Sequence, residues 1–582
     1  MTARLTIVNP IAIPQGDSPT AVAFALAPRP TSLDGLRIGL FWNGKNQGDV
    51  ALARTQDALA KLYDGATFRS YLGDKGGLTR YASEPLKQQI LAECDVLVGT
   101  TADCGSCTSW LMREMAAFEE RGLPTVSWVA VGFEEDARFS AEVFGCPDLP
   151  FAVVPLPFTN GDPVRIAQMV DDAVPPVIEG LTTTPTAERA RPAFEHLTLC
   201  ADESLTFEGD DLLACFDAMN AQFVANGWSD GMPLVPPTRE KVDAMVAASG
   251  RAADDVIGVF APGMGIGTVE KIAANAAMAS AAPNAMPVIL AMAECVLDDT
   301  IGLRTFAMST GPQAPIVMVS GPIADAIGMN HGVCALGPGS RSAVNVAIGR
   351  TLRLLMMNVG HSYPGISDMD TIGSSMKFSA CVAENEARNP WSPFRVMEGY
   401  GVDESTVTVN VPYGVCELFD FQNHDPELLV ESYATVTRNV AGSPSPGVWL
   451  VKEPADPSAG YPFNGVYHNV IMMCPEHAAA FANAGWTIED IKQALHRHST
   501  LPFRTAMVNK PMPLFAASHP ELAHLLDDPD AEVNLYPSAE CFQVFVVGGV
   551  AGRSLYFHGG TVSVTRPVLT PPDPDALLAV AP

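Results

Sequence analysis

Basic residues are scarce in this sequence. The chain has 582 residues, with 35 Lys and Arg against 65 Asp and Glu, which gives a formal net charge of -30. Such a charge repels phosphate backbones unless a local basic stripe overrides it, and the sequence has no such stripe. We therefore expect no nucleic-acid partner.

Long apolar runs are missing too. The most apolar stretch, 344–359, carries Asn345, Arg350 and Arg353, and so lacks the roughly 18 uninterrupted apolar residues that predict a membrane span. The N-terminal MTARLTIVNPIAIPQ lacks the charged flank, apolar core and cleavage site of a signal peptide. We expect a cytoplasmic protein that does not contact membranes. In that reducing compartment its 12 cysteines are mostly thiols.

The signatures of several enzyme classes are absent. The sequence has no P-loop, no HExxH, no G-x-S-x-G elbow and no EF-hand. ATP-driven chemistry and ordinary serine hydrolysis therefore have no support. We also assign no metal ligands and no cofactor.

The first third of the chain alternates apolar runs with helical periodicity. Strands are predicted at 36–42, 94–99, 124–131 and 151–157, and helices at about 50–63, 84–93, 108–121 and 163–174. This alternation favours an α/β fold, a flavodoxin-like doubly wound parallel sheet with helices on both faces. A larger α/β region follows it.

Composition divides the chain into four parts. We expect a flavodoxin-like thiol domain at 1–181, a polar linker at 182–209 and a substrate-binding α/β domain at 210–400. A C-terminal α+β region, 401–582, completes the second domain. Helical spacing predicts helices at 273–296 and 345–359, and 314–322 predicts a strand. Residues 476–499 predict two helices separated by a turn at Gly485, with Thr487 as the cap of the second.

Cys104 and Cys107 form the clearest chemical signal, because they lie between a predicted strand and a predicted helix. Ligands bind beyond the carboxyl ends of parallel strands, and a helix N-terminus favours the reactive thiolate. Ser106 and Thr108 offer hydroxyl donors beside the sulfurs. Two alternatives stay open: a chance pair of buried thiols, or half of a zinc site completed by Cys474, His477 and His468.

The segment DCGSCTSWLMREMAAFEERGLPTV, 103–126, resembles the family named for a U-G-S-C motif, whose first position is selenocysteine or cysteine. The resemblance implies that Cys104 is the nucleophile and Cys107 the resolving thiol. It extends through DGMPLVPPTREKV, TVEKIAANAAMA and AENEARNPWSPF. More distantly, the turn looks like the selenoprotein subunit of glycine, sarcosine and betaine reductases. Trp110 stands where those subunits have a further cysteine.

Several further polar residues are candidates for binding or proton transfer. Gly263-x-Gly265-x-Gly267 precedes a helix that carries Lys271, and such a loop is either an anion cradle or an ordinary glycine turn. His331 and His361 are candidate general acids or bases because histidine titrates near neutrality. The remaining candidates for binding a small anionic substrate are Asn330, Arg341, Asn345, Lys377 and Glu384.

These features predict a thiol-dependent enzyme. Cys104 attacks a small carboxylated substrate and Cys107 resolves the adduct, by reductive cleavage or thiol transfer, with an external thiol or a thioredoxin-like protein as reductant. One alternative is a redox-neutral lyase or hydrolase that uses Cys104 with a histidine acid or base. The other is a metal-dependent enzyme with cysteine ligands. We further expect a homo-oligomer.

Overall fold

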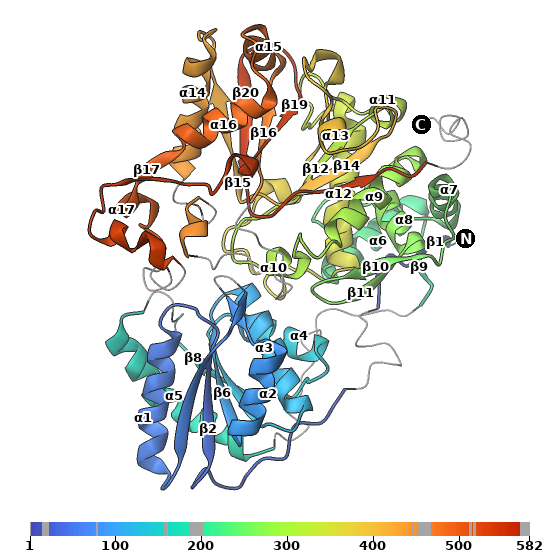
Figure 1. Ribbon diagram of the computed structural model, residues 1–582. Helices are drawn as coiled ribbons and strands as arrows, with labels where there is room; N and C mark the ends of the chain where they lie inside the picture. The colour runs from blue at the N-terminus through green and yellow to red at the C-terminus, as the bar shows by residue number, and fades with distance from the viewer. Residues whose placement is uncertain are drawn as a thin grey trace.

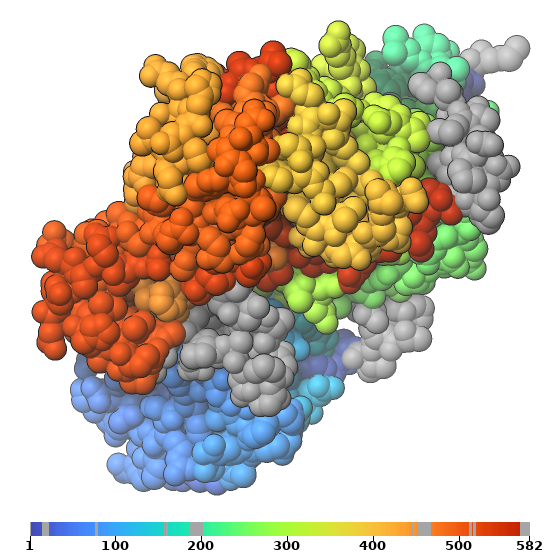
Figure 2. All heavy atoms as spheres, turned by 45° about the horizontal axis from the view of Figure 1, so that its top comes forward, coloured from blue at the N-terminus to red at the C-terminus, as the bar shows by residue number. Residues whose placement is uncertain are grey.

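The structure is a computed structural model that describes residues 2–13, 23–76, 79–155, 158, 161–184, 202–440, 443, 446–451, 467–510, 515 and 519–570. These residues form two lobes (Figure 1). The first lobe comprises the described residues of 23–184, and the second comprises the rest. In Figure 2 the first lobe is the smaller blue body below the larger one.

The elements of the first lobe are β2 (Arg37–Trp42), α1 (Gly48–Leu62), β3 (Thr67–Leu72), β4 (Lys75–Gly76), β5 (Arg80–Tyr81), α2 (Glu84–Glu93), β6 (Val96–Ala102), α3 (Gly105–Glu120), β7 (Thr125–Ala130), α4 (Glu134–Val143), β8 (Phe151–Val154) and α5 (Pro163–Thr182). The five-stranded sheet has the order β3-β2-β6-β7-β8, and all its pairs are parallel. Numbered along the chain this is 2-1-3-4-5, so the lobe has the expected flavodoxin-like fold.

Apolar residues on both faces of this sheet explain why it is doubly wound. Val96 and Val98 of β6 pack on one face with residues of α1 and α5. Leu97 of the same strand packs on the other face with α2, α3 and α4. A strand buried on both faces reads as a continuous apolar run, and the predicted strands at 36–42, 94–99, 124–131 and 151–157 are confirmed as β2, β6, β7 and β8. Residues 156–157 lie outside the described residues.

The elements of the second lobe are β1 (Ala3–Val8), β9 (Ser204–Gly209), α6 (Leu212–Ala225), α7 (Arg239–Ser249), β10 (Val256–Phe260), β11 (Gly265–Thr268), α8 (Val269–Met278), α9 (Met286–Val296), α10 (Leu303–Ala307), β12 (Ile316–Ser320), α11 (Ile323–Ala326), α12 (Ala343–Asn358), β13 (Cys381–Ala383), α13 (Phe394–Met397), β14 (Thr406–Asn410), β15 (Gly414–Phe419), α14 (Pro426–Asn439), β16 (Asn469–Met473), α15 (Pro475–Asn483), α16 (Ile488–His498), β17 (Thr500–Pro502), α17 (Phe503–Ala506), β18 (Glu532–Asn534), β19 (Phe542–Val546), β20 (Arg553–His558) and β21 (Val564–Pro567).

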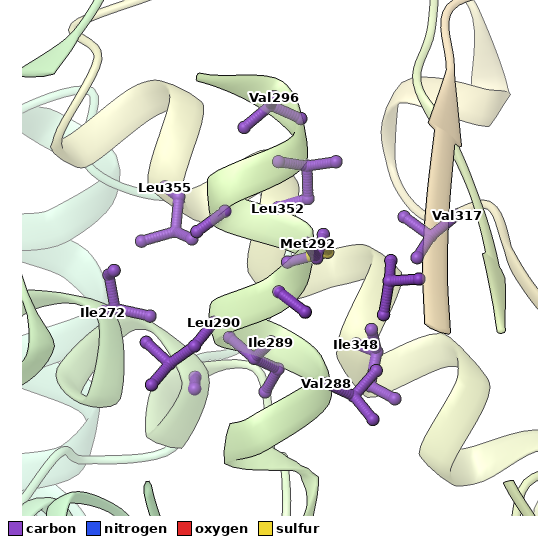
Figure 3. Packing of buried hydrophobic residues seen from close by; sticks show 14 of the residues in the cluster. Ile272, Val288, Ile289, Leu290, Met292, Val296, Val317, Ile348, Leu352 and Leu355 are labelled. Atoms are coloured by element: carbon purple, nitrogen blue, oxygen red, sulfur yellow. The ribbon is translucent and has the colours of Figure 1, made fainter. Parts of the chain in front are cut away.

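The second lobe has two four-stranded sheets between layers of helices. Their strand orders are β13-β12-β14-β21 and β15-β20-β16-β19. Alternate residues of a strand face opposite sides. In β12, Val317 joins the core of α8, α9 and α12, shown in Figure 3, whereas Met318 packs between the sheets with Met472 of β16. On the outer face of the second sheet, Ile471 packs with α14, α15 and α16.

The ends of the first lobe differ from the sequence-based division. β1 pairs with β9 in an antiparallel ribbon from Ala3↔Gly209 to Val8↔Ser204. The first strand of the chain therefore belongs to the second lobe, and the last part of the expected linker is a strand. Thr182, the first residue of the expected linker, is the last residue of α5, and residues 185–201 of the linker lie outside the described residues. In the part of the chain that the structure describes, no helix is long and apolar enough to cross a membrane.

Candidate active site at the Cys104–Cys107 turn

Cys104 is the N-cap of α3. It follows the fully buried strand β6 and Asp103, and its backbone is extended (φ -152°, ψ 158°). Its sulfur accepts the backbone N–H of Cys107 at 3.4 Å, and its carbonyl accepts the Thr108 hydroxyl at 2.7 Å. These two bonds start the helix at Gly105 rather than at the predicted residue 108. Cys107 therefore lies in the first helical turn and not in the loop.

The two cysteines form a disulfide with Cα atoms 5.3 Å apart, within the usual range for such a bond. Their exposure differs, because Cys104 is half-buried whereas Cys107 is only 1% exposed. Two hydroxyls lie beside the sulfurs: Thr79 Oγ1 is 3.4 Å from Cys107 Sγ, and Ser106 Oγ is 3.9 Å from Cys104 Sγ. Thr108 is fully buried beneath the turn.

The loop after β2 holds the carboxyl end of β6. Asn43 Oδ1 accepts the N–H of Thr101 at 3.0 Å, and its Nδ2 donates to the Thr101 carbonyl at 2.8 Å. The carbonyl of Asn43 accepts the N–H of Arg80 at 2.7 Å, next to Thr79. Sequence reasoning did not single out Asn43, Thr79 or Asp103. Asp103, which directly precedes the pair, is the one whose position in the sequence could have revealed it.

The second lobe covers the start of α3. A Cβ on Gly105 would overlap the carbonyl oxygen of Met308 and lie 2.9 Å from Cβ of Met369. Only glycine allows this approach. Figure 1 shows α10, which ends just before Met308, at the junction of the lobes. Phe139 of α4 also packs there with Met308 and Tyr363.

Arg304 of α10 links three segments at the junction. Its guanidinium donates to Ser109 Oγ of α3 at 3.1 Å and to the Pro262 carbonyl at 2.8 Å, and it lies 4.7 Å from the Phe144 ring centroid. Trp110 donates to Thr305 Oγ1 at 3.4 Å. The position that carries a cysteine in the reductase subunits thus contacts α10 here.

His361 and Lys377 lie on the second-lobe side of this junction. His361 is fully buried, its Nδ1 is 2.8 Å from the Tyr363 hydroxyl, and burial lowers its pKa to about 4. It is therefore neutral at neutral pH. Lys377 donates to Asp368 at 2.8 Å and lies 2.9 Å from an Asp370 carboxylate oxygen. These two carboxylates flank Met369. The positive charge of Lys377 is therefore neutralised by ion pairs with its own loop.

Asn330, His331, Arg341 and Asn345 lie at the other end of α12. The helix has 16 residues, which corresponds to about 24 Å, and the loop that faces α3 follows its C-terminus. Asn345 Oδ1 accepts the Asn330 N–H at 2.9 Å, His331 Nε2 is 3.2 Å from Asp325, and Arg341 is exposed. The structure therefore does not bring these four residues to Cys104.

Glu384 is also remote from the cysteines. It follows β13, which runs parallel to β12, and Figure 1 shows β12 above α10, on the side of the second lobe away from the first. The carboxylate is 3% exposed, accepts from Ser320 Oγ at 2.5 Å and from the Phe394 N–H at 2.9 Å, and burial raises its pKa. Glu384 thus hydrogen-bonds the end of β12, through Ser320, and the first residue of α13, Phe394.

The glycine-rich loop before Lys271 is filled by protein. A Cβ on Gly263 would lie 2.5 Å from that of His361, and one on Gly265 would overlap the Val359 carbonyl. Lys271 Nζ donates to the Asn9 carbonyl at 2.7 Å. The loop forms the β10–β11 hairpin and packs against the segment after α12. Of the two alternatives for this loop, the contacts fit the ordinary glycine turn, because the chain itself fills the space around Gly263 and Gly265.

The second group of candidate zinc ligands is separated in space. Cys474 and His468 flank β16, whose five residues put their Cα atoms about 20 Å apart. His477 is bonded on both ring nitrogens, Nδ1 to the Tyr433 hydroxyl at 2.7 Å and Nε2 to the Asp420 carbonyl at 2.9 Å. By contrast, Asp103 lies beside the disulfide, and its carboxylate and both sulfurs are within 4.8 Å of one another.

The comparison with protein families matches residues 6–183 to the UGSC family. This part of the chain, about a third of its length, is similar to the UGSC family. The four residues of the UGSC-family motif are Cys104, Gly105, Ser106 and Cys107, the residues that form the start of α3. The comparisons with curated proteins and with solved structures found no match, so the more distant resemblance to the reductase subunits is not confirmed.

Proposed function

We propose that the protein is a thiol-dependent oxidoreductase that acts on a small, carboxylated substrate through Cys104 and Cys107. The observation that carries the proposal is the unequal exposure of a disulfide-bonded pair at a helix N-terminus. Cys104 is half-buried, whereas Cys107 is 1% exposed. We therefore expect a substrate to reach Cys104 first and Cys107 to attack the resulting adduct from the buried side.

The local electrostatics support Cys104 as the nucleophile. The backbone N–H of Cys107 points at Cys104 Sγ, and the partial positive charge of a helix N-terminus favours a thiolate. Backbone N–H groups and the Ser106 and Thr79 hydroxyls also offer donors to a carboxylate near the sulfurs. The covering residues Met308 and Met369 favour a substrate of small cross-section.

The reaction consists of two displacements. The Cys104 thiolate attacks atom X of a substrate X–Y, which forms an S–X bond while Y leaves with the electron pair and takes up a proton. The Cys107 thiolate then attacks Cys104 Sγ, which forms the disulfide, and X leaves with its electron pair and a proton. The substrate is reduced by two electrons and the dithiol is oxidised. An external thiol or a thioredoxin-like protein restores the dithiol.

Intact-mass analysis of the reduced protein tests this assignment. After treatment with an aromatic disulfide, we expect wild type to end as the internal Cys104–Cys107 disulfide without added mass at this pair. Cys107→Ser should retain one mixed disulfide on Cys104. In Cys104→Ser, the remaining Cys107 should form an adduct at least tenfold more slowly than Cys104 does in wild type. An adduct that forms on Cys107 of the Cys104→Ser variant at the wild-type rate contradicts the assignment.

A matched control separates this pair from the other thiols. Cys334 is an exposed cysteine of the second lobe, so Cys334→Ser should remove one adduct without changing the Cys104–Cys107 reaction. Peptide mapping then assigns every remaining adduct to its residue.

A further inference from the structure

We propose that the reduced turn binds one zinc ion through Cys104, Cys107 and Asp103. The three residues are consecutive or nearly so in the chain, and their ligand atoms all lie within 4.8 Å of one another. This inference goes beyond the proposed oxidoreductase function, because ion binding requires only the dithiol and the carboxylate and no turnover.

The spacing suits one ion. Two sulfurs bound to tetrahedral zinc at about 2.3 Å each are about 3.8 Å apart. Reduction of the disulfide releases the sulfurs from each other, and a small rotation of the Cys104 side chain reaches that separation. The Asp103 oxygen is already within reach of both sulfurs.

The chemistry of the three ligands favours zinc. Two thiolates with one carboxylate form a mixed soft and hard set, which suits zinc better than magnesium or calcium. In the reduced state a divalent ion would lie among two sulfurs and one carboxylate, in a turn where Asp103 is 7% and Cys107 1% exposed.

The surroundings supply a second layer of contacts. The Cys107 N–H donates to Cys104 Sγ, and Thr79 Oγ1 lies 3.4 Å from Cys107 Sγ. Such outer contacts orient the ligands of metal sites. Three protein ligands leave a fourth position for water or a substrate on the half-buried Cys104 side, as in catalytic rather than structural zinc sites.

The site exists in only one redox state. The disulfide uses both sulfurs, so oxidised protein offers Asp103 alone. Zinc and oxidation therefore compete for the same atoms, and bound zinc should slow disulfide formation at least tenfold. The ion would in this way protect the dithiol and control when the pair reacts.

Zinc titration against a chromophoric chelator tests the inference, with the full-length protein reduced by a phosphine. We expect one equivalent per chain for reduced wild type and for Cys334→Ser, and none for oxidised wild type, Cys104→Ser or Cys107→Ser. With cadmium in place of zinc, a thiolate-to-metal absorption band should appear in reduced wild type and reduced Cys334→Ser, but not in oxidised wild type, Cys104→Ser or Cys107→Ser. Full binding by oxidised protein, or by either serine variant, overturns the proposal.

Asp103→Asn tests the third ligand. The amide is a weaker ligand of similar size, so we expect zinc affinity to fall at least tenfold. The variant should still form the Cys104–Cys107 disulfide, which shows that the turn is folded. Unchanged affinity in this variant overturns the role of Asp103. The proposed oxidoreductase function is tested separately, by measuring the reaction with the aromatic disulfide while a chelator keeps the protein free of zinc.

Discussion

Gly105→Ala probes the contact between the lobes without removing a thiol. The added Cβ would overlap the Met308 carbonyl oxygen and lie 2.9 Å from Met369 Cβ, so the backbone of one lobe must shift. Overpacking of this kind costs about 1–3 kcal/mol. Alanine is favoured over glycine within a helix by up to about 1 kcal/mol. We therefore expect a net loss of about 1–2 kcal/mol at the junction.

Hydrogen exchange read by mass spectrometry measures this loss locally. A change of 1–2 kcal/mol corresponds to about 5–30-fold more frequent opening, which we expect in the amides of α10 and of the segment through Met308. Amides of α5, on the far face of the first sheet, should exchange as in wild type. Ser106→Ala at the neighbouring half-buried position is the matched control. Wild-type exchange of α10 in Gly105→Ala would refute the close approach of the two lobes.

Three further substitutions test named contacts. Glu119→Ala removes the buried carboxylate that accepts Arg29 Nη1 at 2.7 Å and Nη2 at 2.8 Å, and should destabilise the first lobe by about 3–5 kcal/mol in denaturant unfolding. Arg304→Met removes the bonds to Ser109 and Pro262 and should raise exchange in α10 while α5 stays protected. His361→Gln should reduce the loss of stability on acidification, measured as the difference in melting temperature between pH 7 and pH 5.

The sign of the pH effect follows from burial. The pKa of His361 falls from 6.5 to about 4 in the folded protein. Below pH 6.5 the unfolded chain takes up a proton that the folded protein excludes until about pH 4. Wild type therefore loses about 2 kcal/mol from this residue between pH 7 and pH 5. An equal loss in His361→Gln contradicts this account, and exposed His424→Gln should behave as wild type.

Controls for the other two variants come from the same helices. Glu120→Ala alters the exposed neighbour of Glu119 and should change stability by less than about 0.5 kcal/mol. Exposed Thr305→Ala on α10 loses only the Trp110 contact at 3.4 Å. Wild-type stability of Glu119→Ala, or wild-type exchange of α10 in Arg304→Met, would show that these contacts do not form in solution.

Sequence alone identified the elements whose pattern depends on their own residues. Strands buried on both faces are continuous apolar runs, so four strands of the first sheet were predictable. The helical pair at 476–499 was predicted with its turn at Gly485 and its cap at Thr487, and the structure confirms both as α15 and α16 with a capping box. The predicted helix at 273–296 is broken into α8, which ends at Met278, and α9, which begins at Met286. The chain leaves the helix at Ser280, which has a left-handed backbone (φ 65°), and Pro283 then begins the short 3-10 turn before α9.

Besides the two-residue strands β4 and β5, the sequence prediction missed β3 and α4 of the first lobe, both for physical reasons. β3 (Thr67–Leu72) is an edge strand with one buried side chain, so its sequence lacks the long apolar run of a central strand. α4 (Glu134–Val143) begins with three acidic residues and has low overall hydrophobicity. Its buried face depends on Ala137, Phe139 and Ala141, too few to give a clear helical period.

The sequence by itself determined the flavodoxin-like class and the position of Cys104 and Cys107 at a strand-to-helix turn, because both follow from local patterns. Only the tertiary structure decided which residues surround that turn. It brought Thr79 to the sulfur of Cys107 and Met308 and Met369 to Gly105, and left His331 and Glu384 far away. Residues distant in sequence meet through the packing of sheets and helices, and the residue types alone do not encode which ones meet.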